Sequence, residues 1–177
     1  GGALTPSALR SLSQAGATSV LMADTAVPPT PAVTYTPDAF TSWAGIDLVL
    51  ADSGLSAALA MPQGNRGEAL LARQRFLAEI AMTAGELPDA SRSIVAAPDP
   101  LWNPRASFVR QTLRALQDVP YARLTGIGKA RRHSLELPRS RVPYTPAQRA
   151  TELPSSYMND VRDQQRAAAR LQAILTE

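Results

Sequence analysis

The stretch SVLMADTAVPP, residues 19–29, contains a short apolar run that ends at Asp24. Short runs dominated by apolar side chains are typical of strands buried on both faces of a parallel sheet. Two later runs repeat the pattern, because IDLVLA ends at Asp52 and SIVAAP ends at Asp99. The repetition predicts three buried strands, each followed by an acidic residue.

Helical patterns lie between these runs. LTPSALRSLSQAG predicts a helix with Thr5 as N-cap, Pro6 at its first position and Gly16 as its stop signal. SGLSAALAM predicts a short helix capped by Asp52 or Ser53. The apolar residues of 67–87 fall on one broad helical face, which predicts a long helix.

The rest of the chain is less regular. Asn103 as N-cap and Pro104 predict another helix after the third strand, and residues 33–35 and 121–128 are further strand candidates. Beyond these, YMNDVRDQQRAAARLQAILTE predicts a terminal helix. We therefore expect an α/β domain at residues 1–129 and a basic linker with a terminal helix at residues 130–177.

Alternating helices and short strands predict an α/β fold with a parallel sheet, either open or part of a β/α barrel. Ligands bind such sheets outside the carboxyl ends of the strands. Five residues near those ends are the predicted ligand-binding residues: Asp24, Asp52, Asp99, Trp102 and Asn103. The alternative is structural, since an Asp after a strand often caps the helix that follows.

The composition limits the chemistry. The chain has no Cys and one His, which excludes thiolate zinc sites, disulfides and a Cys nucleophile within it. His133 lies in a basic stretch and is interpreted as a surface residue. We expect no metal and no cofactor, and we assign no catalytic residue. If the chain is an enzyme, Asp24, Asp52 and Asp99 are the candidates for the carboxylate pair of a glycoside hydrolase.

Charge and hydropathy narrow the possible partners. The net charge is +3, and positive charge is concentrated after residue 120. No nucleic-acid-binding motif accompanies it, so we interpret this region as a solvated face or a contact for an acidic partner. No apolar segment approaches the roughly 20 residues that span a bilayer. The opening GGALTPSALR lacks the features of a signal peptide.

Four stretches in a row carry a family resemblance: LTPSALRSLSQAGATSVLMADTAVPP, LVLADSGLSAALA, RQRFLAEIAM and IVAAPDPLWNPRASFVRQTLRAL. Over roughly residues 3–125 the chain resembles the central region of a family of large exported actinobacterial cell-envelope proteins of unknown function. Their gene often neighbours one for a flippase-like protein of peptidoglycan synthesis. The resemblance implies an extracytoplasmic, membrane-anchored protein of which this chain is a part, with barrel-like regions and no catalytic residues to carry over.

Together these observations predict a non-catalytic module of a cell-envelope protein. Its expected partners are the remainder of the same polypeptide, a cell-wall glycan or lipid-linked precursor, and a flippase-like membrane protein. The alternative is a carboxylate-dependent glycan hydrolase. A nucleic-acid partner is not expected.

Overall fold

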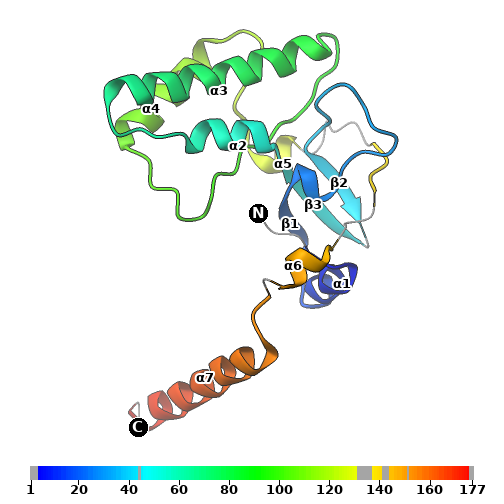
Figure 1. The fold of residues 1–177 in the computed structure, drawn as a ribbon, viewed down its shortest axis with the longest axis vertical. Helices are drawn as coiled ribbons and strands as arrows, with labels where there is room; N and C mark the ends of the chain where they lie inside the picture. The colour runs from blue at the N-terminus through cyan, green and yellow to red at the C-terminus, as the bar shows by residue number, and fades with distance from the viewer. Residues whose placement is uncertain (1–3, 44, 131–136, 141–143, 151, 176–177) are drawn as a thin grey trace. The chain divides into compact units, whose positions relative to one another are not determined.

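A computed structural model of the chain describes residues 4–43, 45–130, 137–140, 144–150 and 152–175. The chain divides into two compact units, Gly1–Pro143 and Tyr144–Glu177. The first contains the sheet and most of the helices (Figure 1). Compactness alone does not define an independently folding domain. The expected division of the chain into domains at residues 1–129 and 130–177 therefore stays a prediction.

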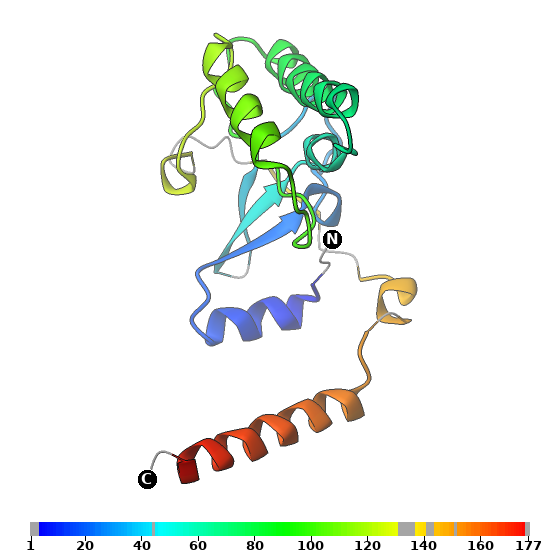
Figure 2. The same ribbon diagram turned by 90° about the vertical axis from the view of Figure 1, so that its left-hand side faces the viewer.

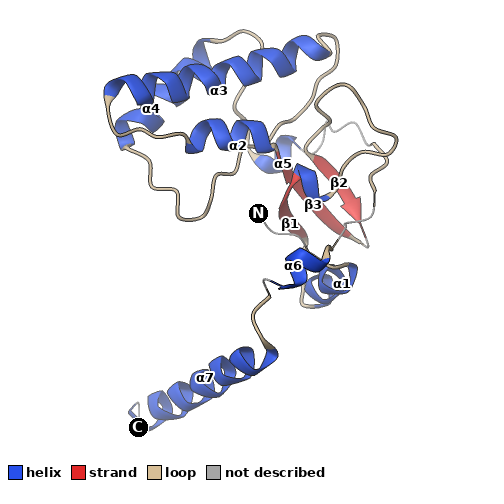
Figure 3. Cartoon of the chain, in the orientation of Figure 1, coloured by secondary structure: helices blue, strands red, loops and turns tan. Residues whose placement is uncertain are grey.

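The first unit is built on a three-stranded sheet with the strand order β1-β3-β2 (Figure 3). The central strand β3, Ile46–Ala51, pairs in parallel with β1, Ser19–Ala23, and antiparallel with β2, Phe40–Trp43. Burial follows this order, since nearly all of β3 is buried while Leu21 on the edge strand β1 is 55% exposed. The sheet is therefore mixed.

The predicted fold of parallel strands alternating with helices was wrong, and the described residues form no barrel. The physical reason is the strand β2, which the sequence did not reveal. Gly45 adopts φ +79 between β2 and β3, a conformation that glycine reaches without strain, and the chain reverses there into an antiparallel pair. Parallel strands instead require a long crossover connection.

Three further strand predictions also need correction. Residues 91–98 form no full strand and touch the sheet through one parallel bridge, between Ala51 and Val95. Residues 33–35 are not a strand. The segment 121–128 is not one either, and its end begins the short helix α5, Ile127–Ala130.

The helix predictions agree better with the structure. Helix α1, Pro6–Gln14, has Thr5 as its N-cap, and the Oγ1 of Thr5 accepts a hydrogen bond from the N–H of Ala8 at 3.1 Å. Gly16 after it has φ +92. Helix α2, Ser53–Ala60, is capped by Asp52.

Two longer helices follow. Helix α3, Arg66–Glu86, begins with a capping box formed by Asn65 and Glu68. Helix α4, Ala106–Asp118, begins after Arg105, so the prediction of Asn103 as its N-cap was wrong. In the second unit the short helix α6, Pro146–Ala150, precedes α7, Ser155–Leu175, which confirms the predicted terminal helix.

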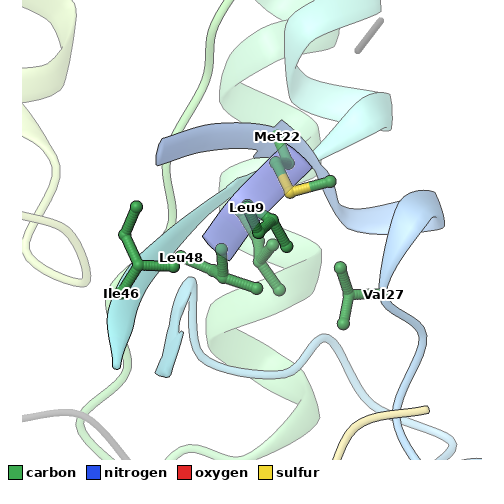
Figure 4. Close-up of a cluster of buried hydrophobic side chains, with 6 residues drawn as sticks. Leu9, Met22, Val27, Ile46 and Leu48 are labelled. Carbon is green, nitrogen blue, oxygen red and sulfur yellow. The ribbon is translucent and has the colours of Figure 1, made fainter. Parts of the chain in front are cut away.

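Two hydrophobic clusters dominate the first unit. One joins α1 to the sheet and contains Leu9, Met22, Val27, Ile46, Leu48 and Leu50 (Figure 4). The other joins α2, α3 and α4 through Leu55, Ala58, Phe76, Ile80 and Leu116. Figures 1 and 2 show these three helices gathered beyond the carboxyl ends of β1 and β3. Helices thus lie beyond the strand ends where ligands were expected to bind.

Arg92 holds the segment after α3 in place. Its side chain is 4% exposed and pairs with Glu86 at 3.1 Å. The guanidinium also donates hydrogen bonds to the carbonyl oxygens of Thr36, at 2.6 Å, and of Thr83. One buried side chain therefore connects the loop before β2, the end of α3 and the segment that reaches Val95.

Candidate functional site

The parallel pairing of β1 and β3 brings two of the predicted aspartates together. Ala23 and Ala51 are partners in the register, so Asp24 and Asp52 follow equivalent positions of neighbouring strands. The hydroxyl of Ser53 donates a hydrogen bond to Oδ1 of Asp24, which links the two strand ends directly. Asp24 and Asp52 also repel each other electrostatically.

Asp52 acts first as a helix cap. Its Oδ1 accepts a hydrogen bond from the N–H of Leu55 at 2.7 Å, which satisfies a donor in the first turn of α2. Its backbone N–H donates to the carbonyl of Val95 at 2.8 Å, so the same residue also fixes the third segment against the sheet. The capping alternative is therefore confirmed for Asp52.

The environment of Asp52 favours its protonated form. Burial raises the pKa of its carboxyl, and the negative charges of Asp24 and Glu79 raise it further, while the N–H groups of Leu55 and Gly54 act in the opposite direction. Glu79 in turn pairs with Arg75 at 2.5 Å, one helical turn away. Asp24, Asp52 and Glu79 therefore form an acidic cluster, in which Glu79 pairs with Arg75 on α3.

Asp99 has a separate structural role. It lies in an exposed turn, where its Oδ1 accepts a hydrogen bond from the N–H of Leu101 at 2.8 Å. Its carbonyl accepts another from the N–H of Trp102, also at 2.8 Å. No hydrogen bond described in the structure joins Asp99 to Asp24 or Asp52. The structure thus brings two of the three aspartates together and uses the third to form a turn.

Trp102 and Asn103 line a pocket of about 330 Å³. Its other walls come from the end of α2 and the loop before α3, including Gln63 and Gly64, and from Pro104 and Arg105. Arg105 closes one side by donating a hydrogen bond from Nη2 to the carbonyl of Gly64 at 2.7 Å.

One polar atom at this pocket lacks a partner among the described residues. Gln63 donates from Nε2 to the carbonyl of Leu59 at 3.0 Å, but its buried Oε1 accepts no hydrogen bond there. A buried acceptor without a partner is costly, so a ligand that donates to it gains affinity. The pocket therefore combines an indole, an amide, a guanidinium and an unpaired acceptor.

The sequence predicted two of the eight residues that line this pocket. Trp102 and Asn103 were predicted from their position after a strand-like run, whereas Gln63 and Arg105 were missed. The only local signal for Gln63 is the loop PQGN before α3, which marks a turn but gives no indication of what packs over it.

A metal site, a membrane-spanning helix or a catalytic role for His133 would each bear on the function. Within the described part of the chain, no three acidic or His side chains are placed to hold a metal ion. No described helix has both the length and the hydropathy needed to cross a bilayer. His133 lies outside the described residues.

Comparisons with known proteins identify the family. The model of a family of unknown function (DUF6049) matches residues 1–176, so the chain belongs to this family. No curated protein and no solved structure matches the chain significantly. The resemblance to a family of unknown function is therefore confirmed at this level.

Proposed function

We propose that this DUF6049 member is a non-catalytic module that binds a glycan of the cell envelope. The observation that carries the proposal is the pocket at Trp102, where an aromatic side chain lies among hydrogen-bonding groups. Sugar rings present apolar C–H faces and a rim of hydroxyls, and binding sites commonly combine aromatic walls with a few placed polar groups. Gln63 Oε1 is free to accept from a hydroxyl or an amide.

The positions of the aspartates support binding without catalysis. A glycoside hydrolase needs two carboxyl groups flanking the scissile bond, about 5–10 Å apart. Asp24 and Asp52 already accept hydrogen bonds from Ser53 and Leu55, and neither lines the pocket at Trp102. Glycan binding therefore needs fewer additional assumptions than hydrolysis.

The cellular setting is part of the same proposal. The ordered resemblance of the four stretches to exported actinobacterial envelope proteins favours an extracytoplasmic, membrane-anchored parent protein. In that setting the partners are the remainder of the polypeptide, the wall glycan or its lipid-linked precursor, and a flippase-like membrane protein. Co-purification from membranes, with the chain in its full-length parent, tests the protein partner.

The experiment for glycan binding is a titration of the chain with soluble oligomers of N-acetylglucosamine. Trp102→Ala removes the aromatic wall, and we expect a loss of affinity of roughly tenfold or more, which corresponds to about 1.4 kcal/mol. Leu101→Ala is the matched control, because Leu101 is the adjacent residue, is 90% exposed and does not line the pocket. Equal binding by both variants would show that the pocket is not the glycan site.

Hydrolysis is the second candidate, favoured by one observation. The raised pKa of the Asp52 carboxyl beside the carboxylate of Asp24 resembles the acid and base pair of a glycosidase. Release of reducing ends from a wall glycan by the chain, abolished in both Asp52→Asn and Asp24→Asn, would support this function over simple binding.

A further inference from the structure

A second pocket, of about 380 Å³, lies at the edge strand β2 of the sheet, where Thr41, Ser42 and Trp43 line it. Side chains alternate along a strand, so Thr41 and Trp43 of β2 project to the same face of the sheet. Their register partners on β3, Leu48 and Ile46, project to this face as well. Thr41, Trp43 and Leu48 all line the pocket. The floor is therefore part apolar and part polar.

A short segment, residues 137–140, forms the opposite wall. It pairs antiparallel with the loop after β1, since the N–H of Thr30 donates to the carbonyl of Pro138 at 2.8 Å and the N–H of Ser140 donates to Pro28 at 2.9 Å. Leu137, Arg139 and Ser140 of this segment line the pocket together with Val27. Residues more than one hundred positions apart thus build one site.

Arg139 is the charged group of this pocket. Its Nη1 donates to the carbonyl of Val27 at 3.1 Å and its Nη2 to the carbonyl of Asp38 at 2.8 Å. Its Nε is buried and has no hydrogen-bond partner among the described residues. The guanidinium is thus held in place by two hydrogen bonds, while its buried Nε–H has no partner among the described residues.

Burial lowers the pKa of the Arg139 guanidinium, while two nearby acidic side chains favour its charged form. The carboxylates of Asp24 and Asp38 both act on the guanidinium. An incoming anion would meet two negative charges for one positive charge, whereas a neutral acceptor would not be repelled. The Nε donor is already buried and unpaired, so a ligand that accepts a hydrogen bond from it satisfies this donor, whereas a purely apolar ligand leaves it unsatisfied.

We infer that this pocket is a second saccharide site, selective for a neutral sugar unit that packs on Trp43 and accepts a hydrogen bond from Arg139 Nε. The hydroxyls of Thr41 and Ser140 both donate and accept, which suits the rim of a pyranose ring. The inference uses residues that the pocket at Trp102 does not contain. It rests on the proposed function only for the class of ligand.

The two tryptophans make the test specific, because the chain contains no others and each pocket holds one. Each indole N–H of the ¹⁵N-labelled chain gives its own NMR signal, assigned with Trp43→Phe and Trp102→Phe. The chain is titrated with the tetramer of N-acetylglucosamine, which is neutral, and with a tetramer of galacturonic acid, which is anionic. We expect the Trp43 signal to shift saturably with the neutral oligomer and to shift little with the acidic one.

Thr41→Val tests the polar wall without removing Arg139, whose hydrogen bonds also support the fold. Replacing the hydroxyl by a methyl group should weaken the response of Trp43 by roughly threefold to tenfold, or about 0.6–1.4 kcal/mol, while the response of Trp102 is unchanged. Thr18→Val is the matched control, because Thr18 is exposed and does not line the pocket. Circular dichroism spectra and melting temperatures of both variants show whether the fold is retained.

The outcomes separate the two proposals. A shift of Trp102 with a silent Trp43 overturns the second site and leaves the proposed function standing. A shift of Trp43 alone supports the second site and overturns the proposed role of the pocket at Trp102, and silence of both signals overturns both. An equal response of Trp43 to the acidic oligomer, or an unchanged response in Thr41→Val, contradicts the selectivity inferred here.

Discussion

Asp52 offers the sharpest prediction, because its carboxyl has two opposing effects on stability. It stabilises α2 as a cap, whereas the burial of its negative charge destabilises the fold. Asp52→Asn keeps an oxygen that accepts from the N–H of Leu55, but it removes the charge. Asp52→Ala removes both. The two variants therefore differ only in the cap, and we expect the Ala variant to be less stable than the Asn variant by about 1 kcal/mol, within a range of 0.5–2.

The effect of the Asp52 charge on stability is seen in how the free energy of unfolding depends on pH. Burial, reinforced by Asp24 and Glu79, raises the pKa of the Asp52 carboxyl above its ordinary value of 3.8. The folded state then retains this proton while the unfolded state has lost it, so the wild-type chain loses stability as pH rises through this interval. We expect Asp52→Asn, which cannot ionise, to gain stability relative to wild type as pH rises from below 3.8 to neutral.

Urea denaturation followed by far-UV circular dichroism measures both effects. A difference of 1 kcal/mol between the two variants corresponds to about 2–4 °C in melting temperature for a chain of 150–250 residues. Asp99→Asn is the control for losing a carboxylate in an exposed turn and should change stability by no more than about 0.5 kcal/mol. Equal stability of Asp52→Asn and Asp52→Ala would refute the cap, and a gain that does not vary with pH would refute the buried charge.

Three further predictions concern the core and its connections. Leu48→Ala removes a fully buried side chain and should lower the free energy of unfolding by about 2–5 kcal/mol in urea titrations, while Leu21→Ala on the exposed edge should change it little. Arg92→Met should lower the free energy of unfolding by about 1.5–3 kcal/mol or more, because one hydrogen bond to a charged group contributes that amount. Native-state hydrogen exchange should then show faster exchange of the amides at the end of α3. Burial alone raises the pKa of Glu86, but hydrogen bonds from Thr36 and Arg92 lower it overall, so Glu86 stabilises the fold above pH 4.5 and this contribution is lost as pH falls through its folded pKa. Glu86→Gln should therefore flatten the acid side of the stability profile, and an unchanged profile would contradict this assignment.

Local chemistry made the helices predictable from the sequence. Thr5, Pro6 and Gly16 delimit α1 through interactions with their immediate neighbours, and Asp52 caps α2 in the same way. Such signals depend on residues within one helical turn, although the same reasoning chose Asn103 wrongly as the cap of α4. The capping box at Asn65 is of the same kind and was overlooked.

The sheet was harder to predict because its pairing is not local. SIVAAP and IDLVLA have the same apolar character. IDLVLA nevertheless forms the central strand β3, whereas SIVAAP makes a single bridge. What separates them is the space beside β3, which β1 and β2 already occupy. The pockets depend on the same kind of information, since Trp43 and Arg139 come to line one pocket only when the chain has folded.

The hairpin between β2 and β3 also determines which residues the second pocket contains. The turn at Gly45 sets Trp43 opposite Ile46 and Thr41 opposite Leu48. Side chains alternate between the faces of a strand, so adding or removing one residue in this turn would exchange the two faces of β2. Phe40 and Ser42 would then face α1, and Trp43 would be carried to the side of Val95. The length of a single turn therefore specifies both the hydrophobic lining of the sheet and the chemistry of the pocket, so an insertion at Gly45 should abolish ligand binding even if the hairpin still forms.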